Sequence, residues 1–204
     1  MAKMVNFGVA YGMSDFGLAE RLHIPREEAQ RFIADYFAAY EGIRRYIVEM
    51  KILARDQGFV STLLGRRRYI PELSARNPSL RQAGERMAIN MPIQGTAADA
   101  IKIAMVRLAD AMRQREMSSR MLLQVHDELV FETDEAELPA LASLAREVMD
   151  SALPLDVPLT VDLKVGADWD RMDRYEPQPD GGWRREARAA EVELDEPVLA
   201  EVLG

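Results

Sequence analysis

The most constraining feature of the sequence is the run Leu122 to Phe131, in which three polar residues separate two apolar stretches. Each stretch is short and rich in aliphatic and β-branched residues, which is typical of a β-strand. A tight turn at His126, Asp127 and Glu128 is therefore expected to join two strands of a hairpin. Carboxylates at such a tip are hard oxygen donors of the kind that hold magnesium beside phosphates. Taken alone, the tripeptide favours the alternative of a solvated acidic turn.

A second pattern lies at the start of the chain, where Lys3, Phe7 and Tyr11 recur at intervals of four. On a helix this spacing places a cation and two aromatic rings along one face. Gly8 and Gly12 lie beside them, and each costs a helix interior about 1 kcal/mol relative to alanine. Their presence indicates a bend or the close approach of another backbone or a ligand. The alternative is an amphipathic helix whose aromatic rings face the core.

Hydrophobic periodicity predicts the other elements. Helices are expected at residues 3–13, 14–22, 25–40, 41–56, 82–90, 94–116 and 138–153, and further strands at 59–64, 68–70 and 158–165. Ser14 can cap the second helix, and Gly58 ends the fourth. Helices that pack on an antiparallel sheet make an α+β fold.

Composition bounds the class of protein. The chain has 204 residues, 48% of them hydrophobic, which is enough to build the core of one or two domains. Its net charge of -8 argues against a simple nucleic-acid-coating protein, but residues 1–90 carry 14 basic and 10 acidic side chains, against 12 and 24 in residues 91–204. No cysteine, leader pattern or membrane-length apolar run occurs, so a cytoplasmic location is expected.

Four sequence blocks resemble the conserved motifs of family A DNA polymerases, the bacterial DNA polymerase I type. The blocks are residues 3–12, 65–69, 85–99 and 125–128, in the family's order and at about its spacing. Any one block would be weak, whereas four in order are specific. The resemblance extends from Lys3 to about Glu176.

In that family the first block meets the incoming nucleotide, and the resemblance implies three roles here. Lys3 matches the lysine that contacts the triphosphate, which a point charge suits. Phe7 matches the aromatic residue that packs against the sugar, and Tyr11 matches the ring that stacks at the template base position. A base stacked on an aromatic ring gains about 1 to 3 kcal/mol. Closure of this helix onto a correct pair would be an induced-fit step.

The middle blocks imply contacts with duplex DNA. Arg86, Asn90 and Gln94 lie four residues apart and would form one helical stripe. Their donors suit the minor groove, which offers acceptors at similar positions in every base pair. A polymerase can therefore test pair geometry there without reading the sequence.

Two further groups of basic residues are matched to DNA contacts. The resemblance implies that Arg66, Arg67 and Arg68 contact template phosphates, and the alternative is a solvated basic turn. His126 resembles the family's histidine near the primer terminus, and its alternative role is that of a satisfied turn histidine.

The mechanism that the resemblance implies is two-metal nucleotidyl transfer with Mg²⁺. One ion would activate the primer 3'-hydroxyl, and the other would bind the triphosphate and stabilise the departing pyrophosphate. Asp127 is expected as a metal ligand, with Glu128 as its acidic neighbour. The expected partners are primer-template DNA and deoxynucleoside triphosphates.

The family takes another metal-binding carboxylate from an upstream motif of the type Asp-Tyr-Ser-Gln-Ile-Glu, which this sequence lacks. We therefore expect the chain alone to be inactive and to need the missing N-terminal part of the polymerase. The alternative is a noncatalytic duplex-binding or interaction module derived from such a polymerase. A single-subunit RNA polymerase is a third option, against which Asn6-Phe7-Gly8 and Glu128 argue.

The expected organisation is a fingers-like helical region at 1–85, with a β-hairpin near 59–70, followed by the C-terminal part of a palm at 86–176 with an antiparallel sheet. Residues 177–204 are rich in proline, glycine and acidic residues, which predicts a disordered tail with a short helix near 183–194. The overall expectation is the α+β C-terminal part of a bacterial, nucleoid-associated enzyme of the cytoplasm.

Overall fold

The structure is a computed structural model that describes residues 2–187, with side chains from Val5 onwards. Two compact units make up the chain, one over Met1–Ala100 and the other over Ile101–Gly204. Helices and small antiparallel sheets occur in both, which confirms the α+β class. None of the helices between residues 2 and 187 combines the length and the apolar character that crossing a membrane requires.

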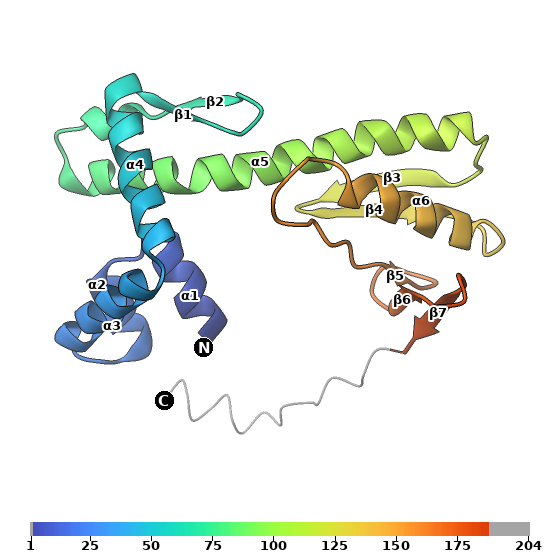
Figure 1. Ribbon diagram of the computed structural model, residues 1–204, viewed down its shortest axis with the longest axis horizontal. Helices are drawn as coiled ribbons and strands as arrows, with labels where there is room; N and C mark the ends of the chain where they lie inside the picture. Colours follow the sequence, from blue (N-terminus) through green and yellow to red (C-terminus); the bar gives the residue numbers. More distant parts are fainter. Residues whose placement is uncertain (1, 188–204) are drawn as a thin grey trace. The chain divides into compact units, whose positions relative to one another are not determined.

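Four helices open the first unit (Figure 1): α1 (Ala2–Ala10), α2 (Asp15–Leu22), α3 (Arg26–Ala39) and α4 (Glu41–Gln57). The predicted cap of α2 is present, since the Ser14 hydroxyl oxygen accepts from the Gly17 N–H. The predicted end of α4 is also confirmed, because Gly58 adopts φ +76° and donates its N–H to the Ala54 carbonyl.

The core of the first three helices forms around α1. Val5 and Val9, one turn apart, are buried with Leu18 of α2 and Ala29 of α3. This leaves the opposite side of α1, which carries Phe7, outside the core.

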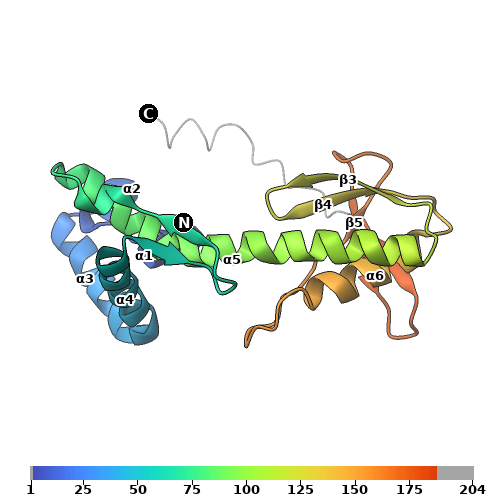
Figure 2. The same ribbon diagram turned by 90° about the horizontal axis from the view of Figure 1, so that it is seen from above.

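A hairpin of β1 (Phe59–Ser61) and β2 (Arg67–Tyr69) follows α4 and pairs in antiparallel register. A short 3-10 helix, η1 (Pro71–Ser74), then leads into α5 (Pro78–Gln114). The hairpin runs alongside α5 in both views (Figures 1 and 2). Its core residues come from four segments and are Ala54, Val60, Ile70 and Ala88.

Helix α5 is continuous, so the predicted interruption between residues 90 and 94 is wrong. Pro92 lies inside it, and a helical proline lacks one N–H and crowds the carbonyl four residues earlier. The helix continues because Ala88 and Ile89 are buried before the proline, and Thr96 donates its hydroxyl to the Pro92 carbonyl after it, at 2.6 Å. Tertiary packing therefore outweighs the local preference for a break.

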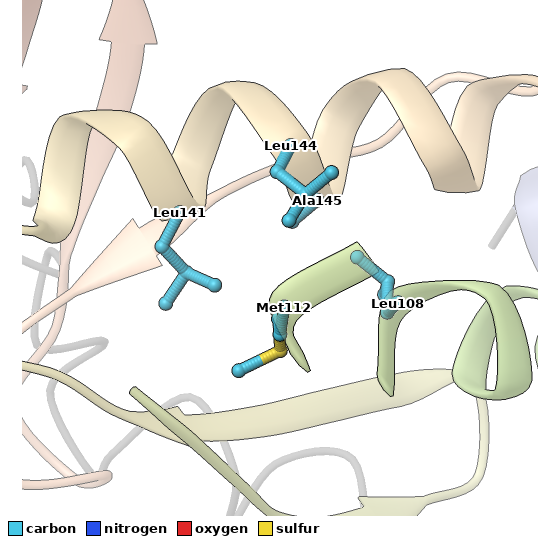
Figure 3. Packing of buried hydrophobic residues seen from close by; sticks show 5 residues of the cluster. All are labelled: Leu108, Met112, Leu141, Leu144 and Ala145. Carbon is cyan, nitrogen blue, oxygen red and sulfur yellow. The ribbon is translucent and has the colours of Figure 1, made fainter. Parts of the chain in front are cut away.

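The second unit surrounds the C-terminal part of α5 with a hairpin, β3 (Arg120–Val125) and β4 (Glu128–Glu132), and with helix α6 (Leu138–Asp150). Figure 3 shows α6 directing its apolar side chains toward α5. The buried residues of this core are Leu108, Met112, Leu141, Leu144 and Ala145. The hairpin adds Met121, Leu129 and Phe131, so its position is set by this core.

A three-stranded sheet completes the second unit, in the order β5 (Lys164–Val165), β6 (Asp173–Pro177) and β7 (Trp183–Glu186). The predicted strand at 158–165 is wrong over most of its length, since only its last two residues form β5, preceded by one hydrogen bond from the Tyr175 N–H to the Leu163 carbonyl. The Val161 N–H donates instead to the Asp150 carboxylate, at 3.0 Å. A side-chain partner thus replaces the ladder that the alternating pattern predicted.

The prediction of a disordered tail with a short helix is wrong where the structure describes that segment, because Trp183–Glu186 form β7. The Trp183 ring stacks on Tyr175 of β6, with centroids 5.1 Å apart, and its indole N–H donates to the Ser143 hydroxyl at 3.1 Å. These contacts anchor the β6–β7 hairpin through the Trp183 ring, which the composition of residues 177–204 did not indicate. Residues 188–204, which the same prediction covers, lie outside the described residues.

Candidate functional site

The first predicted stripe begins on α1, and its last residue, Tyr11, follows directly after the end of that helix. Phe7 and Tyr11 stack one turn apart, with ring centroids at 6.2 Å and planes inclined by 15°. Phe7 is 49% exposed, so this pair offers an aromatic surface to a ligand. Lys3 lies in the same helix, and its side chain is outside the described part of the structure.

The end of α1 lies directly against α5. Gly12 adopts φ +86°, in the left-handed region that favours glycine. A Cβ at this position would lie 3.2 Å from Ile89 Cδ1 and 3.7 Å from Arg86 Cγ. The missing side chain of Gly12 therefore lets the Tyr11 end of the first stripe approach Arg86, the first residue of the second stripe.

Tyr46 of α4, which belongs to none of the predicted motifs, joins this contact. Its hydroxyl donates to the Ile89 carbonyl at 2.8 Å. Burial, together with the nearby Tyr11 phenol, raises the pKa of Tyr46 to about 12. The hydroxyl thus remains a donor at neutral pH. The partners are distant in the sequence, so no local pattern could have revealed the contact.

The second predicted stripe follows one side of α5. Arg86 and Gln94 are exposed, and Asn90 between them is half-buried. The Asn90 Oδ1 atom is buried without a hydrogen-bond partner among the described residues. A buried polar atom is costly when unpaired, so the residues described here leave one end of this amide unsatisfied.

Glu85, which precedes Arg86 of this stripe, forms ion pairs within the protein. Lys51 Nζ of α4 lies 2.9 Å from its carboxylate, and Arg55 forms a second ion pair with it. Burial alone would raise the pKa of Glu85, but the hydrogen bonds and charges of the two cations lower it by more. Glu85 therefore ties α4 to α5.

The three consecutive arginines of the β1–β2 hairpin are exposed but occupy different environments. Arg66 Nε donates to the Asp99 carboxylate of α5, at 2.6 Å. The Arg67 guanidinium carbon lies 4.7 Å from the centre of the Phe59 ring. Arg68 Nη2 lies 3.8 Å from Met87 Sδ. Asp99 is thus a buried partner to which no sequence pattern gave a role.

The predicted metal-binding residues occupy the tip of the β3–β4 hairpin in the second unit. Val125 pairs with Glu128, so His126 and Asp127 form a two-residue turn. His126 adopts φ +53°, which hairpin turns of this length require at their first position. The side chains of His126, Asp127 and Glu128 are all exposed.

The two tip carboxylates fit magnesium in donor type, because that ion prefers carboxylate oxygens and keeps open positions for water and phosphate. Over residues 2–187, however, no three His, Cys, Asp or Glu side chains gather into a group that could hold a metal ion. The described residues thus supply part of a donor set, namely Asp127 and Glu128.

Comparison with known proteins gives one consistent family. The model of DNA polymerase family A matches residues 1–171. The thermostable DNA polymerase I of Thermus aquaticus is 54% identical over 168 residues, which are 82% of this chain and 20% of that protein. DNA polymerase I of Bacillus subtilis (strain 168) is 49% identical over 168 residues, or 82% of this chain and 19% of that protein.

A solved structure agrees with these relatives. The POL domain of Pol1 from M. smegmatis, in complex with DNA primer-template and dNTP, is 50% identical with a TM-score of 0.75. The match covers 77% of this chain and 28% of that chain.

The chain spans about a fifth of the length of the curated relatives that it matches. The four predicted blocks all lie within the matched residues 1–171, whereas β6 and β7 follow them. The resemblance that these blocks predicted is confirmed. Since the family model matches most of the chain, and relatives from separate genera are identical at about half of the 168 aligned residues, the chain belongs to DNA polymerase family A.

Proposed function

We propose that this chain forms the fingers and part of the palm of an enzyme that adds deoxynucleotides to a primer 3'-hydroxyl along a DNA template. The observation that carries this proposal is the contact between α1 and α5, where Gly12 brings Tyr11 toward Arg86. It unites a ring on which a base can stack with a donor for the edges of a duplex. The M. smegmatis relative is described in complex with primer-template DNA and dNTP, which supports the same ligands here.

The nucleotide would lie along the exposed face of α1. Phe7 would pack against the sugar, and Tyr11 would stack at the template base position, since their rings already form one aromatic surface. Lys3, which lies on α1 eight residues before Tyr11, would meet the triphosphate as a compact positive charge. Closure of α1 would then complete the site only over a correct base pair.

The duplex would meet the stripe on α5. Arg86, Asn90 and Gln94 would donate to minor-groove acceptors, since all three side chains carry N–H groups. The arginines of the β1–β2 hairpin would contact template phosphates, and His126 would lie near the primer terminus.

DNA polymerases of this family use divalent metal ions, and we propose Mg²⁺ for this chain. Asp127 and Glu128 would hold it from the hairpin tip, together with a carboxylate from outside the described residues. When bound, the ion would supply positive charge to the primer hydroxyl and the departing pyrophosphate. The exposed tip leaves room for such a second segment and for phosphate oxygens. We place the enzyme in the bacterial cytoplasm, on nucleoid DNA.

A complementation assay tests the proposal. The purified chain is mixed with primer-template DNA, dNTPs and Mg²⁺, alone or with a separately expressed family A segment that carries the upstream carboxylate motif. We expect no incorporation by the chain alone. Incorporation should appear when the segment is added, and the Asp127→Asn substitution should abolish it. Incorporation of ribonucleotides instead would favour an RNA polymerase.

Salt-sensitive duplex binding without incorporation in any combination would contradict the proposed catalysis. That outcome would instead support the alternative of a noncatalytic duplex-binding module.

A further inference from the structure

Helix α5 carries a buried carboxylate to which the proposed function gives no role. Asp99 is 3% exposed, and its two oxygens accept from the Thr62 hydroxyl at 2.7 Å and from Arg66 Nε at 2.6 Å. A buried carboxylate is costly unless charged and polar donors satisfy it. Arg66 supplies the charge and Thr62 a second donor, so Asp99 ties the hairpin loop to α5.

The same network orders the whole loop between β1 and β2. The Arg66 N–H donates to the Thr62 hydroxyl at 3.1 Å, and the Thr62 N–H donates to the Arg66 carbonyl at 3.0 Å. The Leu63 N–H donates to the Thr96 hydroxyl of α5 at 3.1 Å. Both backbone and side chain of Arg66 are therefore held in place before any ligand is present.

The held arginine still reaches solvent. Its bond to Asp99 uses Nε, while the side chain as a whole is 56% exposed. A guanidinium is planar, so fixing Nε also fixes the plane in which the terminal nitrogens lie. An arginine oriented in this way loses less conformational freedom when it meets a phosphate than a free side chain does.

We propose that Asp99 is a positioning residue that orients Arg66 for contact with a phosphate of bound DNA. The inference rests on the proposed function, because it takes duplex DNA as the ligand. For a variant without the Asp99 carboxylate, the proposal predicts a change in DNA affinity opposite to the change that net charge predicts. Removal of one carboxylate makes the chain less negative, which by charge alone strengthens DNA binding. Loss of positioning weakens it.

Fluorescence anisotropy with a labelled primer-template duplex separates these effects. The full chain is titrated at several salt concentrations between about 50 and 200 mM. The variants are Asp99→Asn, Arg66→Ala and the double variant. Asp110→Asn is the matched control, because Asp110 is an exposed carboxylate on the same helix, paired only with Arg113 in the described contacts.

We expect Arg66→Ala and Asp99→Asn each to weaken binding about 3- to 10-fold and to reduce the salt slope by about one phosphate contact. The double variant should match Arg66→Ala, because Asp99 acts through that arginine. Asp110→Asn should bind as tightly as the parent chain or more tightly. Equal or tighter binding by Asp99→Asn, or additive losses in the double variant, would overturn the proposal.

A measurement without DNA distinguishes failure of this proposal from failure of the proposed function. The Arg66 Nε–H proton should give a slowly exchanging NMR signal in the parent chain and in Asp110→Asn. That signal should be absent from Asp99→Asn. An unchanged signal in Asp99→Asn would show that the carboxylate does not orient the arginine. If Asp99→Asn loses the signal but the parent chain and Arg66→Ala bind DNA equally well, Asp99 does orient Arg66 but Arg66 contacts no phosphate. That outcome would refute the proposal.

Folding is controlled with a second variant. If circular dichroism shows that Asp99→Asn is unfolded, Thr62→Val is used instead. It removes one donor to the Asp99 carboxylate and the acceptor of the Arg66 N–H, and it retains the charge of Asp99 and the shape of the Thr62 side chain. We expect Thr62→Val to weaken binding in the same direction with a reduced salt slope. Parent-like affinity and slope in a folded Thr62→Val would contradict the proposal.

Discussion

Gly95 lies where the β1–β2 loop comes closest to α5. A Cβ at this position would lie 2.7 Å from Thr62 Cγ2 and 3.2 Å from Met91 Cε. Met91 can move, since it has several rotatable bonds, but Thr62 is β-branched and held by its hydrogen bond to Asp99. The absence of a side chain at Gly95 is therefore a condition for the contacts that hold Arg66.

We predict that Gly95→Ala lowers the free energy of unfolding by about 1 to 2 kcal/mol, because the clash exceeds the gain in helix propensity. Gly42→Ala in α4 is the control, since nothing lies within 4 Å of a Cβ there, and it should be neutral or stabilising. Urea denaturation measures both changes. A Gly95→Ala chain as stable as Gly42→Ala would show that the loop is not held as described.

Asp15 gives the first unit a dependence on pH. Its carboxylate accepts hydrogen bonds from the Arg26 and Gln30 side chains of α3, which lower its pKa from 3.8 to about 2. A carboxyl whose pKa is lower in the folded state stabilises the fold above its unfolded pKa. This contribution is complete at neutral pH and is lost as the pH falls from about 4 to about 2.

We therefore expect Asp15→Asn to lower the urea midpoint at pH 7, with a gap to the parent chain that narrows as the pH approaches 2. Midpoints at pH 7, 4 and 2 test this directly. A gap of the same size at all three values would mean that the ion pair between α2 and α3 contributes nothing that depends on ionisation.

Among the elements, α5 contributes most to the site, and it does so despite an internal proline. It carries the second stripe, for which we propose contact with the duplex, and the Asp99 network, and both depend on an unbroken helical register through Pro92. The interior position of the proline carries a cost that packing on either side offsets.

We predict that Pro92→Ala raises the free energy of unfolding by about 1 to 3 kcal/mol, because it restores a helical N–H and removes the ring clash. Pro139→Ala is the control, since that proline lies in the first turn of α6, where no intrahelical N–H is lost. Urea denaturation of the two variants should differ clearly. Equal, small effects would show that Pro92 has another compensating role in α5.

At the scale of the whole molecule, each compact unit has its own buried core. The first unit is built around Val9 and Leu18 and around Val60 and Ile70, and the second around Leu108 and Leu144. Separate cores allow a local defect to destabilise one unit without the other.

We predict that Leu144→Ala, at a side chain only 1% exposed, costs about 3 to 5 kcal/mol in the second unit. Hydrogen exchange should then accelerate in α6, β3 and β4, and remain at its parent rate in α1 to α4. Leu122→Ala, at a side chain 50% exposed on β3, should change neither unit. Faster exchange throughout the chain after Leu144→Ala would show that the units unfold together.

Local signals were sufficient for several elements and for the family. Ser14 and Gly58 mark helix ends because capping involves atoms only a few residues apart, and the structure confirms both. The hairpin tip at His126 and Asp127 followed from two short apolar stretches around a polar turn. The four motif blocks identified the family because their residue types, order and spacing are properties of the sequence itself.

Tertiary structure decided the rest. The sequence determined which side chains the proposed site contains, from Phe7 and Tyr11 to Asp127. It also determined the caps and turns that shape each segment. Only the folded chain determined that α5 continues through Pro92 and that Trp183 anchors a strand. It also determined that Asp99 binds Arg66 and that Tyr46 binds the backbone of α5. These outcomes depend on burial and hydrogen bonds between residues far apart in the chain, and such contacts outweigh local preferences without leaving a local pattern.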